Sequence, residues 1–300
     1  MTSSVVNRLE AASDVDAAIV AADLCYAYGD HLAVDGLSFA VAPGEILGFL
    51  GPNGAGKSTT IKMLTGLLRP RSGHIRILGM DMPGEREAIQ GRMGVTFEEK
   101  NLYAAMTARE NLRFFARLHD RPTFDPDPLL RRVGLIDRAG DRVADYSKGM
   151  QQRLMIARAL VNEPDVLFLD EPTSGLDPVS ARAVRAIIRE EAQRGAAVLL
   201  TTHDMAEADT LSDRVAFIHD GRILVEDTPE RLKIAHGQRS VRVRAEVDGQ
   251  VEETVIPLDD DGADERIGRV VQRGGLLTLH TEEATLEDVF VAMAGRGLDA

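Results

Sequence analysis

The chain has 300 residues, and 44% of them are hydrophobic, enough for a sizeable core in one large domain or two unequal ones. Its formal net charge of −13 argues against a nucleic-acid-binding protein, because that class needs a basic surface. The single cysteine, Cys25, excludes an internal disulfide and fits a reducing cytoplasm, and no apolar stretch approaches the roughly 20 residues that span a bilayer.

The N-terminal part of the chain is expected to be a tail followed by strands. Residues 1–17 carry four charged side chains and no long apolar core, so they do not form a secretory signal and are expected to be flexible. Strands are predicted over Ala18–Leu24 and Leu37–Val41, with turns at Tyr28–Asp30 and Val34–Gly36 between them.

Two tyrosines, Tyr26 and Tyr28, lie in this region. Either ring could stack on the face of an adenine, and either could equally be a core or edge-strand residue. The local sequence does not decide between these roles.

A glycine-rich segment predicts a nucleotide site. Two glycines five positions apart are followed by lysine and serine, the pattern of a phosphate-binding loop: Gly51, Pro52, Asn53, Gly54, Ala55, Gly56, Lys57, Ser58 and Thr59. Glycine lets backbone N–H groups wrap a polyphosphate, while Lys57 supplies a cation and Ser58 can ligate Mg²⁺. A strand predicted at Glu45–Leu50 and a helix at Thr59–Leu68 argue against a glycine-rich turn that binds nothing.

A helical insert is predicted over about 98–160. Thr107 and Glu110 have the spacing of a capping box at the start of one helix. A proline-rich connector, Arg121–Pro128, then leads to a short helix that Gly134 ends. Because strand signals are few here, the block is typical of a helical subdomain inserted into an α/β domain.

The segment Tyr146–Met150 opens a further helix and has two interpretations. Ser147 is a good N-cap, which accounts for the residue without any ligand. Alternatively, Ser147, the Gly149 amide and the helix N-terminus form a second anion site. The local sequence favours neither.

The run Val166–Glu171 is the second strong indication of a nucleotide site. Its apolar residues predict a strand buried on both faces of a parallel sheet, with Asp170 and Glu171 at the end where open α/β sheets bind ligands. Asp170 can hold Mg²⁺, and Glu171 can polarise the water that attacks the γ-phosphorus.

Two further residues follow this run. Asp177 before Pro178 is typical of a helix N-terminus and needs no functional role. The run Ala197–Asp204 predicts a buried strand that ends at His203. A lone histidine there is often structural, but it lies at the same sheet edge as the two carboxylates, which favours a contact with phosphate.

The composition changes after residue 235, and residues 236–300 are expected to form a small α+β domain. Strands are predicted at Val241–Val247 and Leu276–Leu279, a loop at Asp259–Asp264, and a closing amphipathic helix at Thr285–Met293. No catalytic constellation is visible in this part.

Together the motifs resemble the ATP-binding subunit of ABC transporters. Five of them occur in family order over residues 18–235: the phosphate loop, a signature motif at Tyr146–Met150, the Mg²⁺ and catalytic strand at Val166–Glu171, a D-loop at Ser174–Asp177 and a switch histidine at His203. The resemblance implies an α/β fold of the P-loop NTPase (RecA-like) class, with an antiparallel β subdomain and a helical subdomain. It implies ATP and Mg²⁺ as cofactors and favours Tyr28 over Tyr26 for adenine stacking.

The resemblance also implies partners. In the family, two copies pack head to tail around two ATP molecules, so a second nucleotide-binding subunit, identical or different, is expected. Membrane permease subunits would dock on the helical insert, which places the chain at the cytoplasmic face of the cell membrane. The catalytic residues would be Lys57, Glu171 and His203. Ser147, Gly149 and Asp177 would contact the nucleotide bound by the partner copy.

One departure from the family's pattern concerns the metal. Glu98, or Glu99 if the register slips, stands where most members have glutamine. A carboxylate adds negative charge near the γ-phosphate, which is repulsive unless Mg²⁺ or another cation offsets it. We hypothesise that Glu98 still reaches the metal shell, with Ser58 and Asp170.

Three features together resemble those of the exporter branch that includes antibiotic-resistance ATPases of the daunorubicin type. They are the signature Ser147–Met150, the glutamate Glu98 and the tail Thr285–Phe290. This implies an ATPase that powers export of a drug, antibiotic or lipid-like molecule. One alternative is a soluble ATPase acting on ribosomes or nucleic acid, but such proteins usually carry two cassettes or long coiled-coil insertions. Another alternative is a module that binds nucleotide without hydrolysing it. The presence of the residues expected for hydrolysis argues against this: Lys57, Asp170, Glu171 and His203.

Overall fold

The computed structural model describes residues 17–99, 101–237, 240–247, 250–258, 262–272, 275–282 and 284–295. Contacts divide the chain into two units, Met1–Val225 and Glu226–Ala300. The boundary between these units lies ten residues before the one expected from the change of composition after residue 235. Apart from Ala17, the expected N-terminal tail lies outside the described residues.

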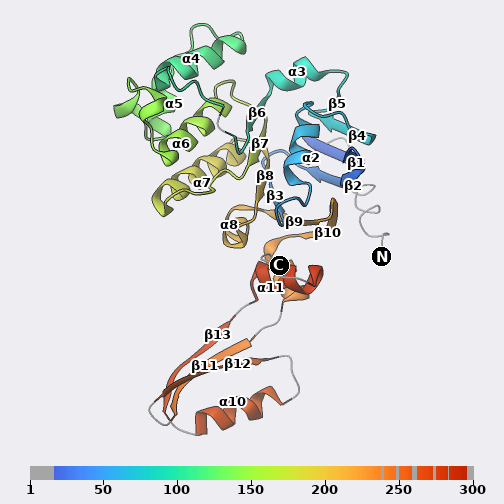
Figure 1. Cartoon of the computed structure of the whole chain (residues 1–300), viewed down its shortest axis with the longest axis vertical. Helices are drawn as coiled ribbons and strands as arrows, with labels where there is room; N and C mark the ends of the chain where they lie inside the picture. The colour runs from blue at the N-terminus through green and yellow to red at the C-terminus, as the bar shows by residue number, and fades with distance from the viewer. Residues whose placement is uncertain are drawn as a thin grey trace. The chain divides into compact units, whose positions relative to one another are not determined.

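The core of the first unit is a sheet of six strands in the order β10-β9-β3-β8-β7-β6 (Figure 1). The pairs β3–β8, β3–β9, β6–β7 and β7–β8 are parallel, as expected for an α/β protein. The strands are β3 (Ile46–Leu50), β6 (Met93–Thr96), β7 (Val166–Asp170), β8 (Ala197–Thr202), β9 (Arg214–His219) and β10 (Arg222–Asp227).

Both faces of this sheet are covered, which explains why β3, β7 and β8 are buried throughout and are apolar except at the ends of β7 and β8. Alternate residues of β7 enter different cores. Phe168 packs in a cluster with Ile61 of helix α2 (Lys57–Leu64). Leu167 belongs to a second cluster, formed with helices of the insert and α7 (Pro178–Gln193).

An antiparallel sheet in the order β2-β1-β4-β5 forms the expected β subdomain. The predicted turn at Val34–Gly36 is wrong, because these residues lie within β2. The pairing of β1 with β2 shifts register between Leu24 and Tyr26, and Gly36 takes a φ of +68°. A bulge therefore absorbs the glycine that suggested a turn. The strands and the adjoining helix are β1 (Ile19–Tyr28), β2 (His31–Val41), β4 (Ser72–Ile77), β5 (Met80–Met82) and α3 (Arg86–Gly91).

The insert is helical as expected. The Thr107 hydroxyl accepts from the Glu110 N–H and the Glu110 carboxylate accepts from the Thr107 N–H, so the capping box is confirmed. The elements are α4 (Ala108–Leu118), α5 (Asp127–Arg132), η1 (Ile136–Arg138), η2 (Val143–Asp145) and α6 (Lys148–Ala159).

Several predicted boundaries differ from the structure, among them the end of β1 and the start of β2, which extend to Tyr28 and from His31. Helix α2 begins two residues before Thr59 and ends at Leu64, because Gly66 takes a φ of +73° and turns the chain. Strand β8 ends at Thr202 rather than at His203, because Asp204 caps helix α8 (Met205–Leu211). No helix in the described ranges is both long and apolar enough to cross a membrane.

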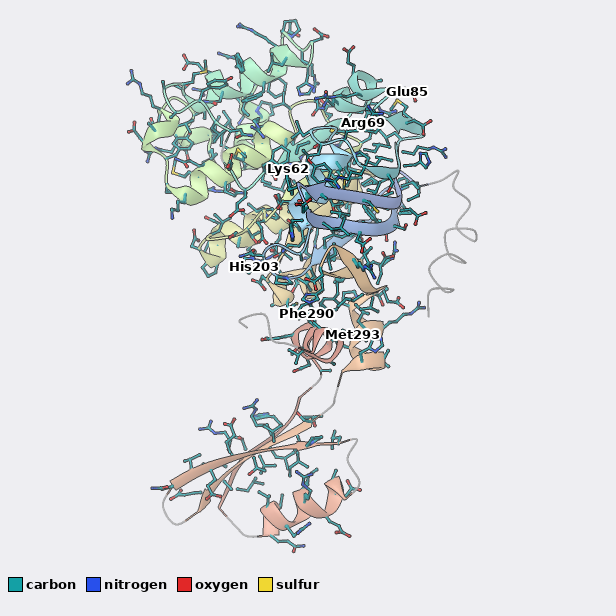
Figure 2. All side chains as sticks on the ribbon, turned by 45° about the vertical axis from the view of Figure 1, so that its right-hand side comes forward. Lys62, Arg69, Glu85, His203, Phe290 and Met293 are labelled. Atoms are coloured by element: carbon teal, nitrogen blue, oxygen red, sulfur yellow. The ribbon has the colours of Figure 1, made fainter. Side chains whose placement is uncertain are left out.

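The second unit is α+β. Its sheet has the order β12-β11-β13, and Val241, Val243 and Ile256 form its core with Ala263 of α10. Phe290 of α11, labelled in Figure 2, is also buried. Residues 259–261 of the predicted loop lie outside the described residues, but Ala263 and Asp264 are helical, so that part of the loop prediction is wrong. The elements are α9 (Pro229–His236), β11 (Ser240–Val247), β12 (Gln250–Pro257), α10 (Ala263–Gln272), β13 (Leu276–Glu282) and α11 (Leu286–Ala294).

Candidate functional site

The glycine-rich loop joins β3 to α2 and depends on its glycines. A Cβ at Gly51 would lie 2.1 Å from the Ile218 carbonyl oxygen, and one at Gly56 would lie 2.5 Å from that of Ala33. Gly54 and Gly56 also take φ values of +84° and +104°. Larger residues would therefore clash or be strained, and the loop keeps the tight course that lets N–H groups surround an anion.

Lys57 is held inside this loop. Its ammonium group donates to the carbonyl oxygens of Gly51 (2.5 Å) and Pro52 (3.1 Å), and the residue is only 6% exposed. Burial lowers the pKa of Lys57, while the charges of Glu171, Asp170 and Glu98 act in the opposite direction. Three of the acidic residues singled out in the sequence therefore act on this one cation.

Asp170 ends β7 beside the start of α2. Its Oδ1 accepts hydrogen bonds from the hydroxyls of Ser58 (3.1 Å) and Thr201 (2.5 Å), and the residue is 3% exposed. Oxygen ligands of this kind suit Mg²⁺. No group of three His, Cys, Asp or Glu side chains suited to holding a metal occurs within the described ranges. Ser58 and Asp170 fit a Mg²⁺ ion that takes its other ligands from water and phosphate.

Glu171 and His203 form a pair at the same sheet edge. Nδ1 of His203 lies 2.9 and 3.0 Å from the two carboxylate oxygens of Glu171. His203 directly follows β8 (Figure 2), and the Glu171 N–H donates to the Thr201 carbonyl oxygen of that strand. Glu171 takes a φ of +49°, a conformation that costs a side-chain-bearing residue energy and turns its carboxylate away from the strand direction.

The pKa of Glu171 is raised. Burial is the largest cause, and the hydrogen bond and charge of His203 and the charge of Lys57 oppose it. A carboxylate with a raised pKa is a stronger base than an exposed glutamate, which suits a residue that polarises water.

Two buried polar residues of this edge were missed in the sequence, Thr201 and Glu207. Glu207, 4% exposed, accepts from the hydroxyls of Thr202 (2.9 Å) and Thr173. A cavity of about 350 Å³ beside it is lined by Glu171 and His203 among others. The two threonines at the end of an apolar strand were the available signal, because buried hydroxyls need partners.

Ser147, Gly149 and Asp177 are placed together, away from the loop. The Ser147 hydroxyl accepts from the Met150 N–H (3.2 Å), and Asp177 accepts from the N–H groups of Val179 and Ser180 (both 3.0 Å), so both are helix caps. A Cβ at Gly149 would lie 3.6 Å from Asp177 Oδ2. Within the described part of the chain, none of the three hydrogen-bonds to residues 51–59.

The remaining candidates are exposed. Tyr28 is 48% exposed, and its ring meets that of Tyr26 edge to face with 4.9 Å between centroids, whereas Tyr26 packs against the core. This leaves Tyr28 as the ring that can receive an adenine. Glu98 follows β6 and is exposed, and its charge acts on Lys57.

Comparison with known proteins agrees with this geometry. The ABC transporter family model matches residues 34–174. A fluoroquinolones export ATP-binding protein of Mycobacterium tuberculosis is 50% identical over 267 residues, which cover 89% of each chain. This chain belongs to the ABC transporter family as an ATP-binding protein.

Two further relatives extend the comparison. Nod factor export ATP-binding protein I of Burkholderia pseudomallei is 42% identical, covering 90% of this chain and 94% of that protein. The dimeric structure of a bacterial ABC transporter cassette has a TM-score of 0.64 and 25% identity, covering 70% of this chain and 98% of that one. The α/β ATPase fold and the family resemblance drawn from the sequence are thus confirmed.

We predict an acid limit of ATP turnover set by Glu171. Because its pKa lies above the ordinary value of 4.5, kcat should fall with decreasing pH sooner than an exposed glutamate would allow, and should be level above that pKa. His203→Ala removes an interaction that lowers this pKa, so it should move the acid limb to higher pH. The measurement is kcat against pH at saturating ATP and Mg²⁺, with a change of the exposed His74 of β4, His74→Ala, as control. If the acid limb of this profile moves to lower pH in His203→Ala, the assignment of the limb to Glu171 is wrong.

Proposed function

We propose that this chain is the ATP-hydrolysing subunit of an export system that acts through separate membrane subunits. The observation that supports it best is the convergence of Lys57, the Ser58–Asp170 pair and the Glu171–His203 pair at one end of the parallel sheet. The relatives from Mycobacterium tuberculosis and Burkholderia pseudomallei are both export ATP-binding proteins, which favours this function over that of a ribosome-directed ATPase.

In this proposal each residue has one role toward ATP. The loop amides and Lys57 bind the phosphates, and Tyr28 stacks on the adenine. Ser58 and Asp170 hold Mg²⁺, which when bound neutralises charge on the phosphate oxygens. Glu171 accepts a hydrogen bond from the attacking water and takes its proton as a general base. His203 orients the Glu171 carboxylate.

The site is completed by a second subunit. Ser147, Gly149 and Asp177 do not reach the loop of their own chain, although Ser147 and the start of α6 offer donors suited to an anion. We place them against the nucleotide held by a partner copy, in the head-to-tail arrangement that the family implies. The dimeric cassette to which the chain is similar supports this. ATP then joins the two subunits, and hydrolysis separates them.

Glu98 joins the metal shell when ATP is bound. Its exposed side chain already acts electrostatically on Lys57, so it lies near enough to sense charge in the loop. A carboxylate at this position is repelled by phosphate unless Mg²⁺ lies between them. Binding of Mg²⁺ and ATP should consequently be more interdependent than with a neutral glutamine.

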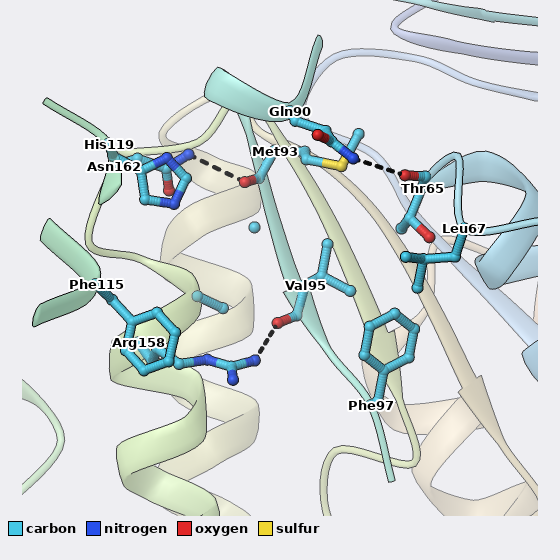
Figure 3. Close-up of a pocket in the computed structure, with 12 residues that line it drawn as sticks. Thr65, Leu67, Gln90, Met93, Val95, Phe97, Phe115, His119, Arg158 and Asn162 are labelled. Atoms are coloured by element: carbon cyan, nitrogen blue, oxygen red, sulfur yellow. Dashed lines mark hydrogen bonds between the residues drawn. The ribbon is translucent and has the colours of Figure 1, made fainter. Parts of the chain in front are cut away.

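The membrane partner docks on the helical insert. A cavity of about 330 Å³ opens where the insert meets the sheet, with Phe97 and Phe115 in its wall (Figure 3). Leu67, 54% exposed, also lines it, and Leu118, 63% exposed, precedes the lining residue His119 in the chain. Exposed apolar residues around a hollow are typical of a protein-binding surface. The cargo proposed is a drug-like or lipid-like molecule that the membrane subunits contact.

The first test is Glu171→Gln. Removing the base should lower ATP turnover by about 10²–10⁴-fold, while ATP binding, measured with a fluorescent analogue, stays near that of the unmodified protein. Because hydrolysis is what separates the subunits, this variant should accumulate as a dimer with ATP on size-exclusion chromatography. Adding Gly149→Arg should abolish the dimer without loss of nucleotide binding. Glu87→Gln, an exposed change on α3, is the control, and equal turnover in the two glutamine variants refutes the mechanism.

The second test concerns Glu98. Glu98→Ala should raise the Mg²⁺ concentration needed for half-maximal turnover, because one proposed ligand is lost. The neighbouring Glu99→Ala serves as the matched control and also tests the alternative register. If Glu98→Ala leaves the Mg²⁺ dependence and turnover unchanged, Glu98 has no role in the metal shell.

The third test concerns the partner. The tagged chain should co-purify with a polytopic membrane protein from detergent-solubilised membranes, identified by mass spectrometry. Leu118→Arg, which places a charge on the proposed docking surface, should abolish this, and Val251→Arg on exposed β12 should not. Co-sedimentation of the chain with ribosomes in place of a membrane protein supports the alternative function.

A further inference from the structure

The loop that carries Glu98 is fastened to helix α6 by one side chain. The Arg158 guanidinium donates from Nη1 to the Asn101 carbonyl oxygen (2.9 Å) and from Nη2 to the Val95 carbonyl oxygen (3.0 Å; Figure 3). These two acceptors lie on either side of Glu98 in the chain. Arg158 therefore fixes both ends of the segment while the carboxylate between them remains exposed.

The same guanidinium contacts the helical insert through an aromatic ring. Its central carbon lies 5.0 Å from the ring centroid of Phe115 on α4, a cation–π distance. Phe115 in turn belongs to an aromatic cluster with Phe114 (5.4 Å between centroids) and Tyr103 (6.0 Å). Arg158 thus connects three elements: α6, the Glu98 loop and α4.

Only arginine among the cationic residues suits this position. Its planar fork can donate to two carbonyls in different directions and stack on a ring at the same time, whereas a lysine ammonium cannot make all three contacts. Burial lowers the pKa of Arg158, but arginine remains charged. Without Arg158, the Val95 carbonyl would lose a donor in a partly buried position, whereas the Asn101 carbonyl is exposed to water.

We propose that Arg158 is a positioning residue that sets the place of Glu98 relative to the metal. It holds the loop in one register with α6 and α4, so that a displacement of the helical insert moves Glu98 with it. The consequence for ATP hydrolysis rests on the proposed role of Glu98 in the metal shell. The positioning itself depends only on the contacts above.

The test is Arg158→Lys in the full chain, with Arg153→Lys as a matched control. Arg153 lies on the same helix and also donates to two carbonyl oxygens, those of Val133 and Gly134, but within the insert. Both variants should lose similar thermal stability. Only Arg158→Lys should increase hydrogen exchange in peptides over residues 94–103, and only it should raise the Mg²⁺ concentration for half-maximal turnover, by about 10-fold, the lower end for lost support of a metal ligand.

A double-mutant cycle with Glu98→Ala completes the experiment. In the Glu98→Ala background, Arg158→Lys should leave the Mg²⁺ dependence unchanged, because the residue it positions is absent. An effect of the same size in both backgrounds, or unchanged exchange at 94–103 in Arg158→Lys, overturns the proposal. If Glu98→Ala alone has no effect, the proposal also fails, and the proposed ATPase function still stands provided that Glu171→Gln abolishes turnover.

Discussion

The candidate site depends on the hydrogen bonds that hold one nearly inaccessible carboxylate. Asp170 accepts from Ser58 at the start of α2 and from Thr201 in β8, so three segments distant in sequence meet at one oxygen. A buried carboxylate without donors is costly, and these hydroxyls offset that cost. Lys57, itself buried, supplies a compensating charge. The acidic sheet edge and the basic loop consequently stabilise each other, and neither is favourable alone.

The parallel sheet explains why this arrangement forms. Strands β3, β7 and β8 are covered on both faces, so their ends are the first places where polar side chains can appear. The positive φ of Glu171 then directs its carboxylate toward His203 while its N–H stays bonded to β8. The local strain is tolerated because the apolar strands on either side fix the position of the chain.

Much of this was accessible from the sequence, because the loop, the apolar strand and both carboxylates are contiguous motifs with a local physical meaning. The capping box at Thr107 was equally local. The predictions that were wrong or missing concern residues whose role depends on partners from other segments of the chain. The bulge at Val34–Gly36 exists because β2 pairs with β1, and Glu207 matters because two threonines from other segments donate to it. Arg158 gave no signal, since its acceptors are backbone carbonyls on another element.

Because Glu98 is exposed, the fold avoids most of the electrostatic repulsion that a third carboxylate near Asp170 and Glu171 would otherwise cause. Buried there, its charge would repel both at low effective dielectric constant, and a single lysine could not balance the three. In water the same charge is screened and costs little. Because Arg158 holds the loop by its backbone, the side chain needs no partner of its own to stay nearby. In the proposed mechanism, repulsion between Glu98 and phosphate would arise only when ATP binds, at the stage where Mg²⁺ would be present to offset it.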